Sequence, residues 1–218
     1  MKTLSFAIVT LSLLFGTLSF AEDNGNMDMM TGSVKITKAP AIETEPAQIV
    51  AAAYVEAADV APEGGFGDKD YSKAFQAMGM EGGHRISDFL KEYNVETTGP
   101  MFAVWYDDPS ETKPQDMTSK WCVPLKAETD PVPGIAIENM PETMAVTCTY
   151  MGAYDASMNA WQAVMKYAED NNLEWTSSPM EVYHKSMMEV ENPDDLITEI
   201  VWPCKKKEMT DDSEEKGE

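Results

Sequence analysis

The feature of this sequence that most constrains its fold is an internal repeat. Two stretches, residues 46–55 and 141–151, are rich in small and β-branched residues, and each carries a tyrosine near its end. Such stretches are typical of β-strands. A helical pattern and two further strand-like stretches follow each of them, so the order β-α-β-β occurs twice. One unit alone has too little sheet to bury a core. We therefore expect an α+β domain of two packed units with a cleft between them.

The spacing of apolar residues places the helices of both units. It predicts a helix over 158–168 in the second unit and a helix over 86–93 in the first. A further segment, 70–80, is expected to form a separate short helix, because Gly82 and Gly83 follow it. The remaining strands are expected at 99–104, 120–124, 178–183 and 199–203. The alternative interpretation is a chance similarity between two α+β stretches.

The first 21 residues have the three parts of a signal peptide. Lys2 precedes an uncharged run from Leu4 to Phe20, and small residues occupy positions 19 and 21, as signal peptidase requires. A membrane anchor is the alternative, but this run is short for a span and is diluted by Ser, Thr and Gly. We therefore expect residues 1–21 to be removed and the mature protein to be exported, periplasmic or secreted, with no stable membrane insertion.

Polar and charged segments flank the predicted domain. Residues 22–33 form a polar spacer, and residues 205–218 form a charged tail. The folded part is expected to span 34–204, with its two units at about 34–126 and 134–204.

Acidic residues greatly outnumber basic ones. The chain has 38 Asp and Glu against 16 Lys and Arg, which gives a formal net charge of −22. Nucleic-acid binding depends on Lys and Arg that neutralise phosphates, so we do not expect a nucleic acid as a partner. An anionic membrane surface would repel the chain for the same reason. We expect neutral or cationic partners, and the sequence does not indicate an oligomeric state.

The cysteines and histidines do not form a recognisable metal motif. Cys122, Cys148 and Cys204 lack paired spacing, and neither His84 nor His184 has a second ligand at metal-binding distance along the chain. We expect no metal and no cofactor. After export two cysteines form one disulfide, or all three stay as buried thiols. The sequence leaves both alternatives open.

Several short motifs resemble one known family. The first unit has a Gly-Pro strand at 99–104 followed by Tyr-Asp-Asp-Pro at 106–109. The second has Gly-Ala-Tyr at 152–154 before its helix and Pro-Met-Glu-Val-Tyr at 179–183. In this order and spacing they resemble the GyrI-like small-molecule-binding domain, also called the bacterial effector-binding domain. The resemblance covers nearly all of residues 34–204.

That resemblance implies a fold and a site. It implies two β-α-β-β units related by a pseudo-two-fold axis, with antiparallel sheets, helices on one side and a pocket between the units. A glutamate on a strand of the second unit lies at the centre of the family's pocket, and it corresponds to Glu181. Family members include sensor domains of transcription regulators, stand-alone binding proteins and hydrolases of cyclopropane-bearing natural products. We expect this chain to differ from the regulators because the sequence shows no DNA-binding segment, and from the cytoplasmic stand-alone members because it has a leader.

Glu181 is the leading candidate for a functional residue. It stands between apolar neighbours and shares one strand face with Tyr183. A carboxylate in an apolar pocket is costly unless it is paired, so it attracts a cation or takes up a proton and serves as a general acid or base. The alternative is an exposed glutamate on a solvent face. Phe102 occupies the matching place in the first unit.

Aromatic residues on the predicted strands are candidates to line the pocket. Aromatic faces around an acid suit flat apolar ligands and cations. The alternative for each of them is ordinary core packing. The candidate ligand-binding residues are Glu181, Tyr183, Tyr150, Trp105, Phe102, Tyr54 and Trp121.

Three function classes fit these features. The first is an exported binding protein for an apolar, cationic or aromatic small molecule. The second is a hydrolase of small electrophilic natural products with Glu181 as general base; apart from Glu181, the sequence indicates no catalytic residue. The third is a structural or interaction protein whose cleft is filled.

Overall fold

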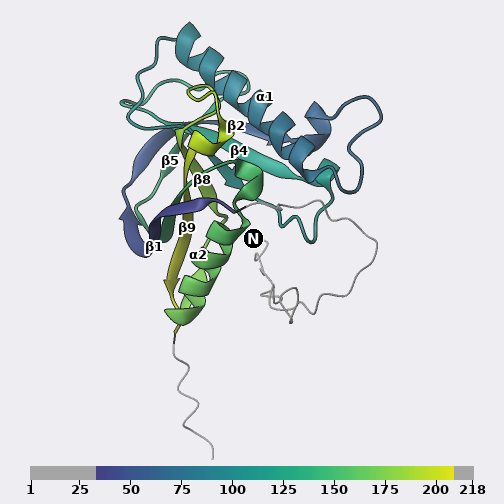
Figure 1. The fold of residues 1–218 in the computed structure, drawn as a ribbon. Coiled ribbons are helices and arrows are strands. Elements are labelled where there is room, and N and C mark those ends of the chain that lie inside the picture. Colours follow the sequence, from purple (N-terminus) through teal and green to yellow (C-terminus); the bar gives the residue numbers. More distant parts are fainter. Residues whose placement is uncertain (1–32, 209–218) are drawn as a thin grey trace, which may run out of the picture.

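The computed structural model describes residues 33–208 as one sheet with helices packed against it (Figure 1). The predicted signal peptide, nearly all of the spacer and the end of the tail lie outside the described residues. No helix in the described part is long and apolar enough to cross a membrane. The strands are β1 (Lys35–Glu45), β2 (Gln48–Glu56), β3 (Phe102–Trp105), β4 (Thr118–Pro124), β5 (Ala136–Met140), β6 (Thr143–Met151), β7 (Leu173–Trp175), β8 (Met180–Lys185) and β9 (Ile197–Lys206). The helices are α1 (Tyr71–Glu92) and α2 (Met158–Asp170), with short 3-10 turns η2 (Ala57–Val60), η3 (Pro114–Asp116), η4 (Tyr154–Ala156) and η5 (Pro193–Asp195).

The strand order confirms the predicted duplication. The nine-stranded antiparallel sheet has the order β1-β6-β9-β8-β3-β4-β2-β5, and β7 pairs with β9 at the side. Strands β3 and β8 join the two units in the middle of the sheet, with Ala103 directly opposite Glu181. Counted outward from this pair, β4-β2-β5 on one side corresponds to β9-β6-β1 on the other. The pseudo-two-fold axis therefore passes between Ala103 and Glu181.

The units exchange their first strands. Strand β1 precedes β2 in the chain but pairs with β6 of the second unit, from Lys35 opposite Met151 to Glu45 opposite Thr143. Strand β5 precedes β6 but pairs with β2 of the first unit. Neither β1 nor β5 was predicted from the sequence. The exchange ties the two halves together, so the stretches 34–126 and 134–204 do not pack as separate bodies.

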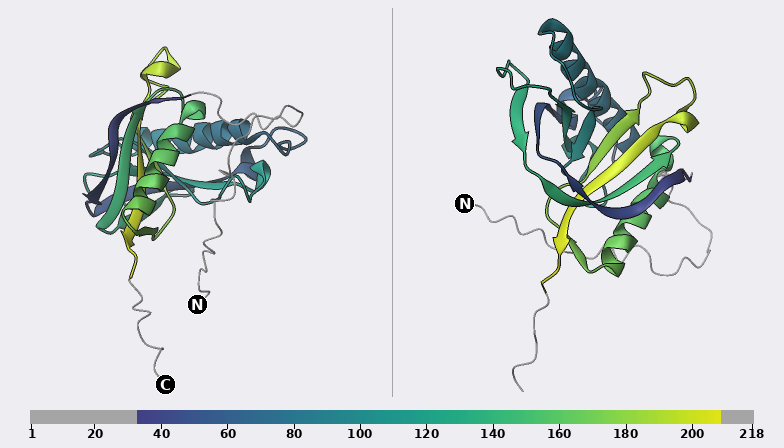
Figure 2. Two further views of the ribbon diagram at one scale, coloured as in Figure 1. Left: turned by 60° about the horizontal axis from the view of Figure 1, so that its bottom comes forward. Right: turned by 90° about the vertical axis from the view of Figure 1, so that its left-hand side faces the viewer.

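Both helices lie on one face of the twisted sheet, as the resemblance implied (Figure 2). Helix α1 packs against β2 and β4, and α2 packs against β6. The helix-free face is nevertheless buried at its centre, where Val50, Phe102 and Val201 are at most 2% exposed. Because strand side chains alternate between faces, the residues on either side of each of these point toward the helices.

Helix α1 is one continuous helix of 22 residues, so the predicted short helix over 70–80 and its break at Gly82 and Gly83 are wrong. Gly82 lies on the buried face of α1, against Trp121 of β4. A Cβ atom at Gly82 would lie 2.1 Å from Trp121 Cγ, a distance that no real contact allows. The glycine lets the helix approach the indole closely, and that requirement outweighs its cost within a helix.

The three cysteines are free and buried in the described part of the chain. Cys122 belongs to the core of the helix-free face, whereas Cys148 and Cys204 lie in the core beneath α2. Burial raises the pKa of the Cys122 thiol to about 12 and that of Cys148 to about 11. The structure therefore favours the alternative of three unreactive thiols over a disulfide.

The close packing at Gly82 gives a testable difference between two adjacent glycines. Gly82→Ala should lower the free energy of unfolding by about 1–3 kcal/mol, because the new methyl group overpacks against Trp121. At Gly83 an added Cβ meets nothing within 4 Å, so Gly83→Ala should leave stability unchanged or raise it by up to about 1 kcal/mol through helix propensity. Denaturant unfolding of both variants measures this. Equal effects would contradict the packing argument.

Candidate functional site

Glu181 lies at the junction of the two units, on the face that carries the helices. It occupies β8, where Ala103 of β3 and Ile200 of β9 are its neighbours across the sheet. Its side chain is only 9% exposed. The predicted buried acid is therefore present, and it sits at the point where the pseudo-two-fold axis meets the sheet.

Aromatic donors from both units converge on the carboxylate. Trp105 of β3 donates its indole Nε1–H to Glu181 Oε2 at 3.1 Å. Tyr150 of β6 donates its hydroxyl to Glu181 Oε1 at 3.2 Å. None of the ion pairs between described residues includes Glu181. Neutral aromatic donors thus hold the carboxylate, and no basic side chain of the described residues balances its charge.

Stacked rings form the wall on the α1 side of the site. Tyr183 stacks on Trp121 with ring centroids 5.5 Å apart and an angle of 10° between the planes. Trp121 meets the edge of Trp105 at 6.0 Å, and Trp105 meets Phe75 of α1 at 5.0 Å. On the other side, Tyr154 of η4 contacts Tyr183 edge to face at 5.5 Å. Such contacts fix the orientation of the rings that surround Glu181.

Burial dominates the electrostatics of the site. It raises the pKa of Glu181, and hydrogen bonds from Trp105, Tyr150, Tyr183 and Trp161 partly offset the rise. Burial, together with the Glu181 charge, also raises the pKa values of Tyr150 and Tyr183 well above the ordinary value and that of Tyr154 to about 12. The tyrosines stay neutral donors at physiological pH. Glu181 is therefore the one group of this cluster that is an acid of ordinary pKa below 7, and burial favours its neutral form.

The structure brings together three of the predicted lining residues and sets a fourth behind them. Trp105, Tyr150 and Tyr183 all act on Glu181. Trp121 is only 7% exposed and holds Tyr183 and Trp105 in place from behind. Its position is that of a supporting residue and not of a lining residue.

Phe102 and Tyr54 do not belong to this cluster. Phe102 lies in the core of the helix-free face, because the register places Ala103, and not Phe102, opposite Glu181. Tyr54 is 51% exposed and donates its hydroxyl to Glu138 Oε1 at 2.7 Å. Counted along the strand pairs, Val55 and not Tyr54 takes the place that Tyr150 has in the second unit. A one-residue offset moves a strand side chain to the other face.

Three aromatic residues of the site were not predicted as lining residues. Trp161 of α2 acts on Glu181, Tyr154 precedes α2, and Phe75 lies on α1. Trp161 stands at the edge of the buried stripe of α2, which runs through Ala160, Val164 and Ala168. Helical spacing placed Trp161 on an apolar face but gave no sign that this part of the face meets the acid.

Glu181 is only 9% exposed, and Trp105, Tyr150 and Tyr183 act on its carboxylate. A cavity of about 370 Å³ in the described part lies elsewhere, between η2 and α1. It is lined by Asp59, Val60, Ala77, Met80, Glu81 and His84.

The chain belongs to the family of GyrI-like small molecule binding domains, whose model matches residues 39–205. Proteins of this family bind small molecules, which agrees with an acid enclosed by aromatic rings. Comparison with functionally curated proteins gave no match.

Solved structures show the same fold. The C-terminal domain of EcmrR has 22% sequence identity, a TM-score of 0.62, and an alignment that covers 79% of this chain and 100% of that one. EcmrR in a complex with DNA has 23% identity and a TM-score of 0.61; 77% of this chain aligns, and it spans 57% of the EcmrR chain. A hydrolase from Listeria innocua has 13% identity, a TM-score of 0.52 and coverage of 77% and 92%. At these identities the likeness concerns the fold alone.

The raised pKa of Glu181 predicts how Glu181→Gln affects stability. A raised pKa in the folded state means that burying the carboxylate costs free energy, and this cost is absent below the unfolded value near 4.5. It grows as the pH rises toward the folded pKa. Glu181→Gln should therefore match the wild type at pH 4 and below, and exceed it in free energy of unfolding near pH 7. Denaturant unfolding across this range, without ligand, measures the difference; curves that stay parallel at all pH values would contradict a costly buried carboxylate.

Proposed function

We propose that this protein is an exported binding protein that captures an apolar small molecule with a positive charge or an aromatic ring at Glu181. The observation that carries the proposal is a buried carboxylate whose hydrogen-bond partners are aromatic donors and which has no ion-pair partner among the described residues. A bound cation would supply the missing counter-charge. The surrounding ring faces would contact its apolar part.

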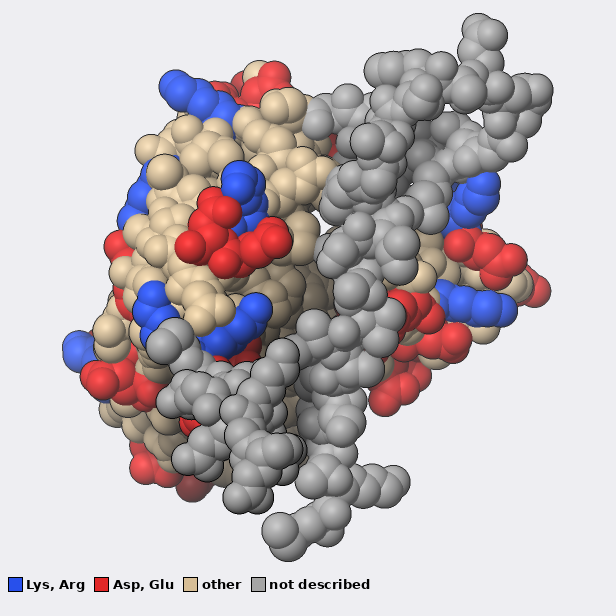
Figure 3. Space-filling view, turned by 90° about the horizontal axis from the view of Figure 1, so that it is seen from below, with Lys and Arg blue, Asp and Glu red and all other residues tan. Residues whose placement is uncertain are grey.

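The overall charge of the chain supports a cationic ligand. A net charge of −22 raises the local concentration of cations around the protein and speeds their encounter with it. Acidic side chains (red) are spread over the face seen in Figure 3, with Lys and Arg between them. An anionic ligand would meet repulsion both at this surface and at Glu181.

A melting-temperature experiment tests ligand binding at Glu181. The probes are phenyltrimethylammonium, its neutral isostere tert-butylbenzene, and benzenesulfonate. A ligand that binds only the native state at 100 times its Kd adds about 2.7 kcal/mol of stability. We expect the cation to raise the melting temperature of the wild type, benzenesulfonate to have no effect, and Glu181→Gln to lose the response.

Glu138→Gln is the matched control, because Glu138 lies on the edge strand β5 and bonds to Tyr54 and Lys120, away from this cluster. It should keep the response to the cation. No shift with any probe would contradict the proposal and favour a filled site with a structural role. A separate hydrolysable electrophile, phenyl acetate, tests the hydrolase alternative: its loss over time with the wild type but not with Glu181→Gln, checked by chromatography, would indicate that alternative.

Export is the second part of the proposal, and it is supported by the leader-like pattern of residues 1–21. Expression of the full chain in a Gram-negative host should yield a periplasmic product that begins at Glu22. Intact-mass measurement of the fractionated protein checks the cleavage site. A full-length product in the cytoplasm would contradict this part without affecting ligand binding.

A further inference from the structure

A buried hydroxyl without a hydrogen bond lies next to the site. Thr198 of β9 is fully buried, and its Oγ1 is the one buried side-chain oxygen or nitrogen atom of the described residues that lacks a partner. The register places Thr198 opposite Tyr150 of β6 on one side and opposite Tyr183 of β8 on the other. An unpaired buried polar atom costs free energy, so its presence requires an explanation.

Tyr150 connects this hydroxyl with Glu181. Tyr150 is fully buried, and its hydroxyl donates to Glu181 Oε1 at 3.2 Å. The hydroxyls of Thr198 and of buried Ser157 lie beside the phenol and lower its pKa, although burial raises that pKa overall. A phenol has one proton to donate. While that proton is committed to the Glu181 carboxylate, the acceptor lone pairs of Thr198 Oγ1 stay unused.

Protonation of Glu181 would reverse the donors. The new carboxylic O–H needs an acceptor, and the Tyr150 oxygen is already within hydrogen-bond distance. The Tyr150 proton must then turn away from Glu181. Of the two hydroxyls beside the phenol, those of Ser157 and Thr198, that of Thr198 is the one whose buried oxygen lacks a partner. One proton enters at Glu181, and otherwise only hydrogen bonds change direction. No covalent bond to another atom forms or breaks.

We propose that Thr198 is a positioning residue whose hydroxyl serves as the acceptor for the protonated state of the Glu181–Tyr150 pair. The same site then holds Glu181 as a carboxylate beside a cationic ligand and as a neutral acid beside an uncharged one. The proton state of Glu181 is what adapts the site to the ligand's charge. The part that concerns ligands rests on the proposed function, whereas the part that concerns the proton does not.

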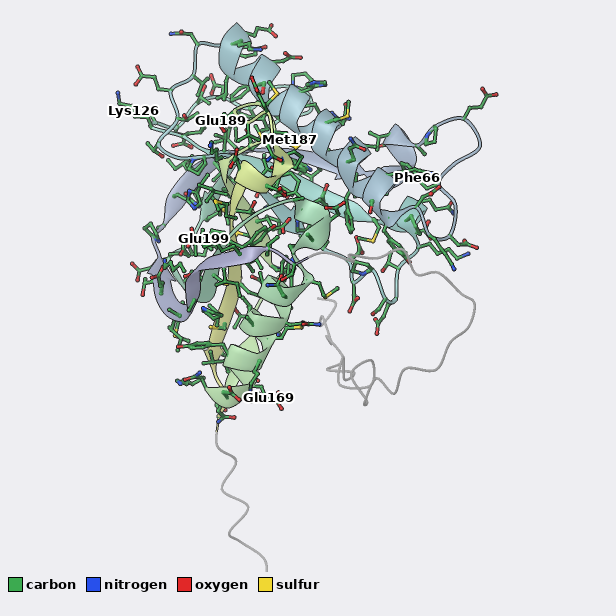
Figure 4. The ribbon with its side chains drawn as sticks, viewed as in Figure 1. Phe66, Lys126, Glu169, Met187, Glu189 and Glu199 are labelled. Carbon is green, nitrogen blue, oxygen red and sulfur yellow. The ribbon has the colours of Figure 1, made fainter. Side chains whose placement is uncertain are left out.

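The other groups that face Glu181 do not take over this role. Trp105 from β3 and Trp161 from α2 donate through indole N–H groups, which cannot accept a proton. Tyr183 lies on β8 itself and Tyr154 on η4, and burial keeps both phenols neutral. Glu189, on the loop that follows β8 (Figure 4), also raises the pKa of Tyr154 through its charge. On α1, the apolar Phe75 contacts Trp105 of the site.

Infrared titration of the ligand-free full chain tests the proposal. A protonated carboxylic acid has a carbonyl band that its carboxylate lacks. The part of this band that disappears in Glu181→Gln reports the protonation of Glu181 directly. In Thr198→Val the acid form loses its acceptor chain, so the midpoint of this band should move to lower pH by about one unit. Thr198→Ser, which keeps the hydroxyl, should restore the midpoint of the wild type.

Thr147→Val is the matched control. Thr147 is equally buried, but it lies on the helix-free face and its hydroxyl donates to Glu43. Its midpoint should equal that of the wild type. Because Thr198→Val removes an unpaired hydroxyl without a change of shape, it should be at least as stable as the wild type, so misfolding will not mimic the effect. An unchanged midpoint in Thr198→Val, or a shift of equal size in Thr147→Val, would overturn the proposal.

A binding arm separates this proposal from the proposed function. In the wild type, tert-butylbenzene should bind more tightly as the pH falls and phenyltrimethylammonium less tightly. Thr198→Val should move both pH profiles to lower pH. If neither probe binds but the infrared shift is seen, the proposed function fails and the role of Thr198 stands. If both probes bind and Thr198→Val leaves their pH profiles unchanged, the proposed role of Thr198 is wrong and the proposed function stands.

Discussion

The burial of one carboxylate is the constraint on which this structure depends. Glu181 stands where the two units meet, and a charge removed from water is tolerated only with compensating partners. Its hydrogen-bond donors include Trp105 from the first unit and Tyr150 from the second. The site therefore exists only when both units are in place, and the exchange of β1 and β5 between them secures that arrangement. The packing of the two units and the candidate site therefore depend on the same pair of strands, β3 and β8.

The packing of α1 carries this constraint outward. The missing side chain of Gly82 lets Trp121 pack directly against the backbone of α1. Trp121 in turn stacks on Tyr183 and makes a T-shaped contact with Trp105. A residue behind the candidate site thus fixes the orientation of the rings beside Glu181. The helix-free face is packed separately through Phe102 and Val201. The alternation of side chains along each strand divides the sheet into a site face and a supporting face.

The sequence predicted the duplicated strands, the two helical regions and the central acid, because each depends on local spacing. It did not predict β1, whose partner lies about a hundred residues away, whose pairing has register shifts and which contains Pro40. The predicted break at Gly82 was wrong because this glycine makes room for Trp121, a tertiary contact, and does not end the helix. Tyr54 and Phe102 were misplaced by a one-residue offset between the units. The direction of Trp161 depends on how α2 packs, and spacing alone does not give it.

The central claim is that Glu181 is a buried acid whose charge a cation can balance. Calorimetric titration with phenyltrimethylammonium near pH 5, in two buffers of different ionisation enthalpy, tests it most directly. The claim predicts that binding releases a proton into the buffer, so the observed enthalpy differs between buffers in the wild type but not in Glu181→Gln. Binding with the same enthalpy in both buffers, unaltered by Glu181→Gln, would contradict it.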